Sequence, residues 1–330
     1  MSPRPIYISA SRRTDIPRFF SDEFFAAWKK GKITYNGGYG RSYTVSLKPE
    51  DVLGFIFWSK DYSLFIRRPL FKELLQTNNA IFHYTINDCP ALEPNVAPLK
   101  QRLSTLNRLC DFVGPERVMW RFDPICRYEA APGVFVTNEA AFHELLPKIG
   151  KTGIRRCYFS FMSDYKKLAN RGIKFKAIGE EDRIAIAGKM LCSAMNAGME
   201  LFNCCNEKIA QSVPGIYMAH CIDDDVLSKT DRFGVHRTLP LKPTRSGCGC
   251  YESRDVGSYE PKCPHGCLYC YANPSLFTKH FDLDMPASRN RSDKAAEDRA
   301  KRTAENKTRN ARCNAVTDPN DTDDDPGEFS

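Results

Sequence analysis

The chain has 330 residues, of which 42% are apolar, and its formal charge at pH 7 is +8. This composition supports a full-sized hydrophobic core, and no run reaches the roughly 18 apolar residues that span a membrane. The first residues place charges on both sides of a short apolar stretch, unlike a signal peptide, so we expect a soluble cytoplasmic protein. The positive charge suits an anionic substrate, a phosphate-bearing cofactor or nucleic acid, without selecting among them.

Apolar runs alternate with helix-like segments over the first part of the chain. Runs of strand length predict strands at 6–11, 52–59, 80–87, 117–125, 155–162 and 199–205. Helical spacing predicts helices at 21–32, 62–76, 96–114, 137–150 and 180–198, with a short one from 206. Because strand–helix alternation implies a parallel sheet, we predict an α/β fold. The architecture expected is a partial or closed (β/α) TIM-like barrel, with a doubly wound open sheet as the alternative.

We expect three regions along the chain. Residues 1–240 form the barrel, and residues 241–285 form a cysteine-rich segment that folds over the barrel mouth. Residues 286–330 are polar and mixed in charge. Because such a composition cannot bury enough apolar surface to order itself, we expect a disordered tail.

Charged and polar side chains gather where the predicted strands end, which is where both α/β architectures bind ligands. The residues singled out are Arg12, Arg13, Asp15, Trp58, Lys60, Arg121, Asp123 and Glu207. Strand ends are often merely exposed and polar, but Trp58, Arg121 and Asp123 interrupt or directly end apolar runs. Since buried charges need partners, we expect Arg–Asp pairing inside the mouth.

These side chains also suggest roles in binding and chemistry. The three arginines and Lys60 would hold an anionic substrate or cofactor, because guanidinium groups suit carboxylates and phosphates. Asp15, Asp123 and Glu207 would orient those groups or handle protons.

Fourteen cysteines are many for this length, and clustered cysteines in a reducing compartment more often bind metal than form disulfides. Cys263, Cys267 and Cys270 form a Cys-x3-Cys-x2-Cys array, with Tyr269 before the last cysteine. Thiolate-rich spacing of this kind selects zinc or an iron–sulfur cluster. Plain thiols are the third alternative.

The array resembles the signature of the radical S-adenosylmethionine superfamily. That resemblance implies a [4Fe–4S] cluster on three thiolates, an open fourth iron that chelates S-adenosylmethionine, and a partial (β/α)6 barrel. Tyr269 and Trp58 are the candidate contacts to the cofactor. Here, however, the barrel-like region precedes the array, and no Gly-Gly-Glu stretch follows it to hold the methionine part. The binding of S-adenosylmethionine is therefore an open question.

Several longer motifs, including ISASRRTDIP, FIFWSK, WRFDPI and CPHGCLYCYAN, resemble a bacterial family named domain of unknown function 1848. The family is noted for a C-terminal cysteine cluster similar to that of radical S-adenosylmethionine enzymes, and the resemblance covers nearly all of 5–275. It also highlights Cys205, Cys221, Cys248 and Cys250. These four could bind a second cluster or a zinc ion, or could be buried thiols that line the barrel mouth.

Our leading hypothesis is a radical S-adenosylmethionine-like or redox enzyme that acts on a small anionic substrate, with a reductant such as a flavodoxin or ferredoxin. In an enzyme of this kind the cysteine loop must return to Arg12, Trp58 and Arg121 at the mouth. The second hypothesis is a structural zinc or iron–sulfur protein that binds nucleic acid. It ranks lower because lysine and arginine are spread evenly along the chain. Electron transfer without S-adenosylmethionine is a third reading.

Overall fold

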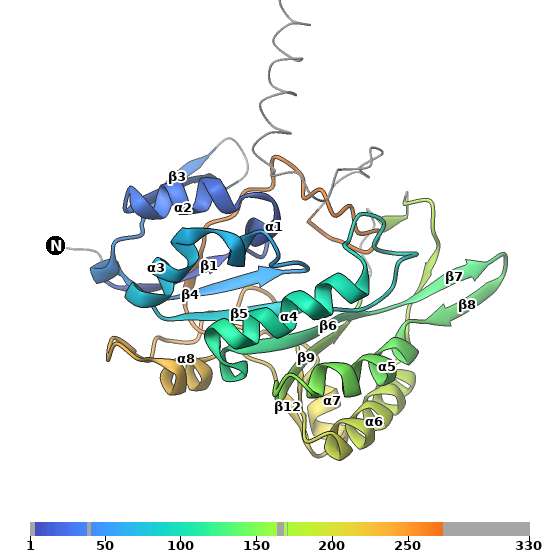
Figure 1. The fold of residues 1–330 in the computed structure, drawn as a ribbon. Coiled ribbons are helices and arrows are strands. Elements are labelled where there is room, and N and C mark those ends of the chain that lie inside the picture. Colours follow the sequence, from blue (N-terminus) through green and yellow to red (C-terminus); the bar gives the residue numbers. More distant parts are fainter. Residues whose placement is uncertain (1–3, 38–40, 164–167, 170, 273–330) are drawn as a thin grey trace, which may run out of the picture. The chain divides into compact units, whose positions relative to one another are not determined.

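The computed structural model describes residues 4–37, 41–163, 168–169 and 171–272, and its centre is an eight-stranded parallel sheet (Figure 1). The strands are β1 (Ile6–Ala10), β4 (Val52–Ser59), β5 (Ala80–Thr85), β6 (Val118–Ile125), β9 (Arg156–Phe161), β11 (Glu200–Asn203), β12 (Ile216–Met218) and β13 (Ser253–Asp255). Across the sheet they lie in the order β13-β1-β4-β5-β6-β9-β11-β12. Seven strands thus follow chain order, and β13 returns to pair with β1 at the far edge.

This order confirms the α/β class and the parallel sheet, and it corrects the doubly wound alternative. A doubly wound sheet reverses its strand order at a switch point, whereas β1 to β12 are added in one direction only. A closed barrel is not observed in the described ranges either, because β12 and β13 lie at opposite edges of the sheet. The predicted tail, 286–330, lies outside the described residues.

The remaining elements connect and cover this sheet. The helices are α1 (Ile16–Phe19), α2 (Ser21–Lys29), α3 (Pro69–Thr77), α4 (Leu99–Val113), α5 (Glu139–Gly150), α6 (Glu180–Asn196), α7 (Glu207–Ser212) and α8 (Asp224–Thr230), with 3-10 turns at Pro49–Asp51, Phe65–Arg67 and Pro115–Arg117. Two small antiparallel sheets comprise β2 (Lys32–Asn36) with β3 (Ser42–Ser46), and β7 (Arg127–Ala131) with β8 (Val134–Thr137) and β10 (Phe175–Lys176). None of the described helices combines the length and apolarity needed to cross a bilayer.

One face of the large sheet is aromatic and covered by helices. Phe57 on β4 contacts Phe24 of α2, with ring centroids 5.3 Å apart, and Trp120 on β6 stacks on Phe142 of α5 at 5.1 Å. Helices α3, α4 and α5 run along this face (Figure 1). Burial of each such ring contributes up to about 3 kcal/mol to the stability of this layer.

The opposite face is covered by the segment after β12, which includes helix α8. Ile56, Ile81 and Met119 lie in one buried cluster with Ile222 and Leu227, which belong to the segment after β12. Because strand side chains alternate with period two, Trp58, His83 and Arg121 share this inner face, one step nearer the carboxyl edge. The fold therefore places the side chains of Trp58, His83 and Arg121 together at the carboxyl edge, next to the apolar cluster.

Candidate active site

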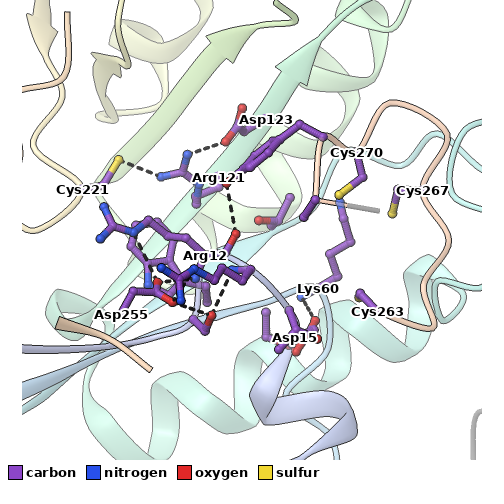
Figure 2. A pocket seen from close by; sticks show the side chains of 18 of the residues that line it. Arg12, Asp15, Lys60, Arg121, Asp123, Cys221, Asp255, Cys263, Cys267 and Cys270 are labelled. Carbon is purple, nitrogen blue, oxygen red and sulfur yellow. Dashed lines mark hydrogen bonds and ion pairs between the residues drawn. The ribbon is translucent and has the colours of Figure 1, made fainter. Parts of the chain in front are cut away.

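A cavity of about 580 Å³ opens at the carboxyl edge of the sheet. Every predicted site residue except Glu207 lines it. Glu207 instead begins α7 with an exposed side chain, which accepts a hydrogen bond from Gln211 (3.2 Å). Figure 2 shows Cys263, Cys267 and Cys270 at one end of this cavity and Cys221 beyond Arg121 at the other.

The loop that carries Cys263, Cys267 and Cys270 is fixed to the carboxyl edge by its own backbone and by His265. Leu268 N donates to the carbonyl of Leu92 (2.9 Å), and Asn95 Nδ2 donates to the carbonyl of Pro264 (2.9 Å). His265 Nε2 donates to Asp15 Oδ2 (2.9 Å). The cysteine loop therefore returns to the end of β1, as an enzymatic role requires.

Asp15 is a junction between three elements rather than a group open to substrate. Its Oδ1 caps α1 by accepting from Arg18 N (3.0 Å) and also accepts from Ser59 Oγ (2.7 Å). Its Oδ2 accepts from Lys60 N (2.9 Å) and from His265. Since both oxygens are engaged, the structure favours a positioning role for Asp15.

Lys60 belongs to a buried polar cluster beneath the same loop. Its Nζ donates to Glu93 Oε1 (2.6 Å) and to Tyr269 Oη (2.7 Å), while Tyr269 Oη also donates to Glu93. Asn87 Nδ2 donates to Glu93 Oε1 (3.1 Å) and to Tyr269 Oη (3.0 Å). Burial disfavours the charged forms of Lys60 and Glu93, but their mutual attraction outweighs this effect. Glu93 therefore raises the pKa of Lys60, and Lys60 lowers the pKa of Glu93. The hydroxyl of Tyr269 is therefore committed to holding the loop.

The three thiols of the loop have the chemistry of a metal-binding set. Burial raises the pKa of Cys263 well above its ordinary value, and the neighbouring charges of Asp15, Cys267 and Cys270 raise it further. Burial likewise raises the pKa of Cys267 to about 12. Thiols that repel one another as thiolates lose that penalty when they share a cation. A soft, thiolate-bound group fits this end of the cavity.

Arg12 and Arg13 are held at the sheet edge by Asp255, at the end of β13. Asp255 Oδ2 accepts from the backbone N of Arg12 (2.8 Å) and from its Nε (3.4 Å). Arg13 Nη1 donates to the carbonyl of Gly257 (3.0 Å), and its guanidinium lies between the rings of Tyr35 and Tyr259. Both arginines line the cavity with about a quarter of the side chain exposed (22% and 25%). Each guanidinium retains donors for a further acceptor.

Arg121 is the buried cation at the centre of the cavity wall. It pairs with Asp123, which also accepts from Ser160 Oγ, and its Nη1 lies 3.1 Å from Cys221 Sγ. Burial disfavours its charge, but Cys221 and Asp123 outweigh that effect and raise the pKa of Arg121. With Arg12 and Asp255, this pair is the Arg–Asp pairing that we expected inside the mouth.

Trp58 lines the cavity next to Arg121, and the buried ring of His83 stacks on it. Their rings stack with centroids 4.3 Å apart, and the guanidinium of Arg121 lies 5.2 Å from the Trp58 ring. Trp58 Nε1 donates to Ser9 Oγ (3.0 Å), and His83 Nε2 donates to the carbonyl of Cys221 (2.8 Å). Burial and the charge of Arg121 lower the pKa of His83 to about 4, so this imidazole is neutral at pH 7.

The sequence reasoning missed several residues of the cavity. Those that the structure adds are Cys204, Arg245, Asp255 and His265 on the wall, with Glu93 behind it. Cys204 precedes Cys205 directly and His265 lies inside the cysteine array, so both carried a local signal. Arg245, Asp255 and Glu93 reach the site only through the fold.

Within the described ranges, no set of three or more His, Cys, Asp or Glu side chains already has the geometry to hold a metal ion. Binding of a metal by the cysteines that line the cavity would therefore require their side chains to move.

These features define an α/β protein with a thiol- and arginine-lined cavity at the carboxyl edge of a parallel sheet. The chain belongs to the family described as Domain of unknown function (DUF1848), whose model matches residues 7–272. No curated protein matches the chain. Among solved structures, a morphinone reductase is similar, with 13% identity over 57% of this chain and a TM-score of 0.28. The match covers 52% of that reductase, about half of its length.

Proposed function

We propose that this protein is an iron–sulfur enzyme, of redox or radical S-adenosylmethionine-like type, that acts on a small anionic substrate. One observation carries the proposal: Cys263, Cys267 and Cys270 line the same cavity as Arg12 and Arg121. A purely structural cluster has no need to face a cavity with cations on its other wall.

Cys263, Cys267 and Cys270 would hold the cluster. A [4Fe–4S] cluster with three protein ligands keeps one iron open to an exogenous ligand and supplies single electrons. The chain's own part is positioning, because His265 and Tyr269 tie the loop to Asp15 and to Lys60 with Glu93. A flavodoxin or ferredoxin is the proposed source of electrons.

Arg12 and Arg13 would bind the anionic group of the substrate. Asp255 fixes both arginines, so their remaining N–H donors are pre-oriented toward the cavity. A volume of about 580 Å³ suits a small carboxylate or phosphate compound rather than a polymer. This small volume, together with the even spread of lysine and arginine along the chain, is why the nucleic-acid alternative ranks second.

The finer architecture and location belong to the same proposal. Seven strands in chain order, with an inner face filled by the segment after β12, support a partial (β/α) barrel. All thirteen cysteines in the described ranges are free thiols, which suits a reducing compartment and supports a cytoplasmic location.

The test is anaerobic reconstitution with iron and sulfide, followed by metal analysis and electron paramagnetic resonance of the reduced protein. The expected result is about four irons and four sulfides at this site. They should be lost when Cys263, Cys267 and Cys270 are changed to alanine together. Cys192→Ala is the matched control, because Cys192 is exposed on α6 and does not line the cavity.

A change in the spectrum on adding S-adenosylmethionine would identify the open-iron ligand, whereas an unchanged spectrum would assign electron transfer without it. Uptake of zinc alone, or iron retained in the triple variant, would overturn the proposal. Salt-sensitive retention on nucleic acid, with no iron bound, would favour the alternative.

A further inference from the structure

A second group of thiols lies across the cavity from the cysteine loop. Cys204 Sγ is 3.5 Å from Cys205 Sγ and 3.7 Å from Cys221 Sγ. Cys250 also interacts electrostatically with Cys221 and Cys248, as Cys248 does with Cys205. Linked in this way, the five cysteines form a ring that lines one side of the cavity. They come from three separate segments, at the end of β11, after β12 and at 248–250.

The spacing of these sulfurs suits a single ion. A tetrahedral zinc ion with Zn–S bonds of about 2.3 Å holds its sulfurs about 3.8 Å apart. The measured separations around Cys204 are 3.5 and 3.7 Å. In a [4Fe–4S] cluster each cysteine binds a different iron, so the thiolate sulfurs stand much farther apart. The ring is thus too tight for a cluster unless it opens.

Two arginines supply the charge that such a site needs. Arg121 Nη1 lies 3.1 Å from Cys221 Sγ, and Arg245 Nε lies 3.0 Å from Cys205 Sγ. A divalent ion with four thiolates carries a net charge of −2, which the two guanidinium groups partly offset, since Arg121 also pairs with Asp123. Neutral core thiols would be poor acceptors for these donors, since guanidinium favours anionic partners.

The backbone brings the third segment onto the ring. Gly247 has a φ of +71°, and a Cβ atom there would lie 3.2 Å from the carbonyl oxygen of Cys205. Only glycine accepts both the left-handed conformation and this close approach. Cys248 N then donates to the carbonyl of Arg245 (3.1 Å), which folds the loop so that Arg245 and Cys248 both face Cys205.

We propose that Cys204, Cys205, Cys221, Cys248 and Cys250 form a second metal site, which binds one zinc-sized divalent ion through four of the five thiolates. The side chains must rotate onto the ion, because the described residues do not yet present three ligands at bonding geometry. The sulfurs around Cys204 are already near the spacing of a complex. The proposal is independent of the cluster on Cys263, Cys267 and Cys270.

The experiment uses the full chain with Cys263, Cys267 and Cys270 changed to alanine, so that only the second site can bind. Apo protein is titrated with Co²⁺ under reducing, oxygen-free conditions, and the visible spectrum reports tetrahedral thiolate coordination. One Co²⁺ per chain is expected, displaced by Zn²⁺. Adding Cys221→Ser with Cys250→Ser should abolish the spectrum, whereas adding Cys192→Ser should leave it unchanged.

A second measurement needs no further variant. In the same triple variant, Zn²⁺ should protect the ring cysteines from alkylation by at least tenfold, as read residue by residue by mass spectrometry. Cys192 serves as the unprotected internal reference. Absence of both the cobalt spectrum and the protection would overturn the proposal. Uptake of about four irons with sulfide by this variant would also overturn it, because the ring would then hold a cluster.

Discussion

His265 Nε2 lies 2.9 Å from Asp15 Oδ2, and this contact joins the cysteine loop to the turn after the first strand. Both side chains are buried, and Asp15 also caps α1 and accepts from the backbone of Lys60. The contact therefore links the loop of the proposed cluster ligands directly to the end of the strand that precedes Arg12 and Arg13.

His265→Ala should loosen the cysteine loop more than the protein as a whole. Loss of a buried, charge-assisted hydrogen bond costs about 2 kcal/mol, and here the released backbone carries Cys263 and Cys267. We expect faster alkylation of both cysteines and lower iron content after reconstitution. His236→Ala is the matched control, because His236 also pairs with an aspartate, Asp224, at 3.0 Å. Equal alkylation rates in the two variants would contradict this role.

Tyr269→Phe tests the polar cluster beneath the loop. The variant keeps the ring but removes the hydroxyl that bonds to Lys60, Glu93 and Asn87. We expect the unfolding free energy to fall by about 1–2 kcal/mol and hydrogen exchange at 267–270 to accelerate. The same change at Tyr217, a half-exposed residue of the edge strand β12, should have little effect on either. Unchanged exchange in Tyr269→Phe would show that the hydroxyl does not hold the loop.

Arg121→Gln should be strongly destabilising in protein free of metal. It leaves the carboxylate of Asp123 without its cation in a largely buried wall, an effect of about 3 kcal/mol. Chemical denaturation provides the measurement, and Arg155→Gln, at an exposed position, is the comparison. A loss below about 1 kcal/mol would mean that water replaces the guanidinium at little cost.

The buried imidazole of His83 gives a prediction for pH. Its folded pKa is about 4 against an ordinary 6.5, so between these values the unfolded chain binds more protons. The contribution of His83 to the free energy of unfolding should therefore be complete above pH 6.5. The free energy of unfolding should fall by about 3 kcal/mol as the pH drops to 4. Denaturant titrations across this pH range should show the free energy of unfolding falling with pH in the wild type and in His143→Gln. In His83→Gln the dependence on pH should be weaker. Parallel lines for wild type and His83→Gln would exclude the effect.

The sequence was sufficient for the long strands and insufficient for the short ones. Strand β4 falls on the predicted 52–59 because a strand buried on both faces is a continuous apolar run. Strands β12 and β13 have three residues each, too few for any periodicity to register. Since β13 forms one edge of the sheet, the pairing of the two ends of the fold could not be anticipated.

Some residues of the candidate site could be predicted from the sequence and others could not. Trp58, Arg121 and Asp123 were predictable because they stand at the ends of apolar runs. Polar groups in such places need partners, and these are found at the carboxyl edge that the parallel strands share. Glu93 was not, because it lies in a loop 33 residues after its partner Lys60, with no local pattern. Glu207 was selected from its place after a strand, but it is the first residue of α7 and its side chain is exposed.

The pairing of β1 with β13, in which Tyr7 lies opposite Ser253, constrains how the protein is made. While the chain is still on the ribosome, β1 can pair with β4 but leaves its other edge open until the carboxyl-terminal part has emerged. An open strand edge is a template for aggregation. Asp255, which fixes Arg12 and Arg13, arrives with the same late strand. The nascent protein therefore cannot hold these two cavity-lining arginines in place before nearly all of the described chain has been synthesised.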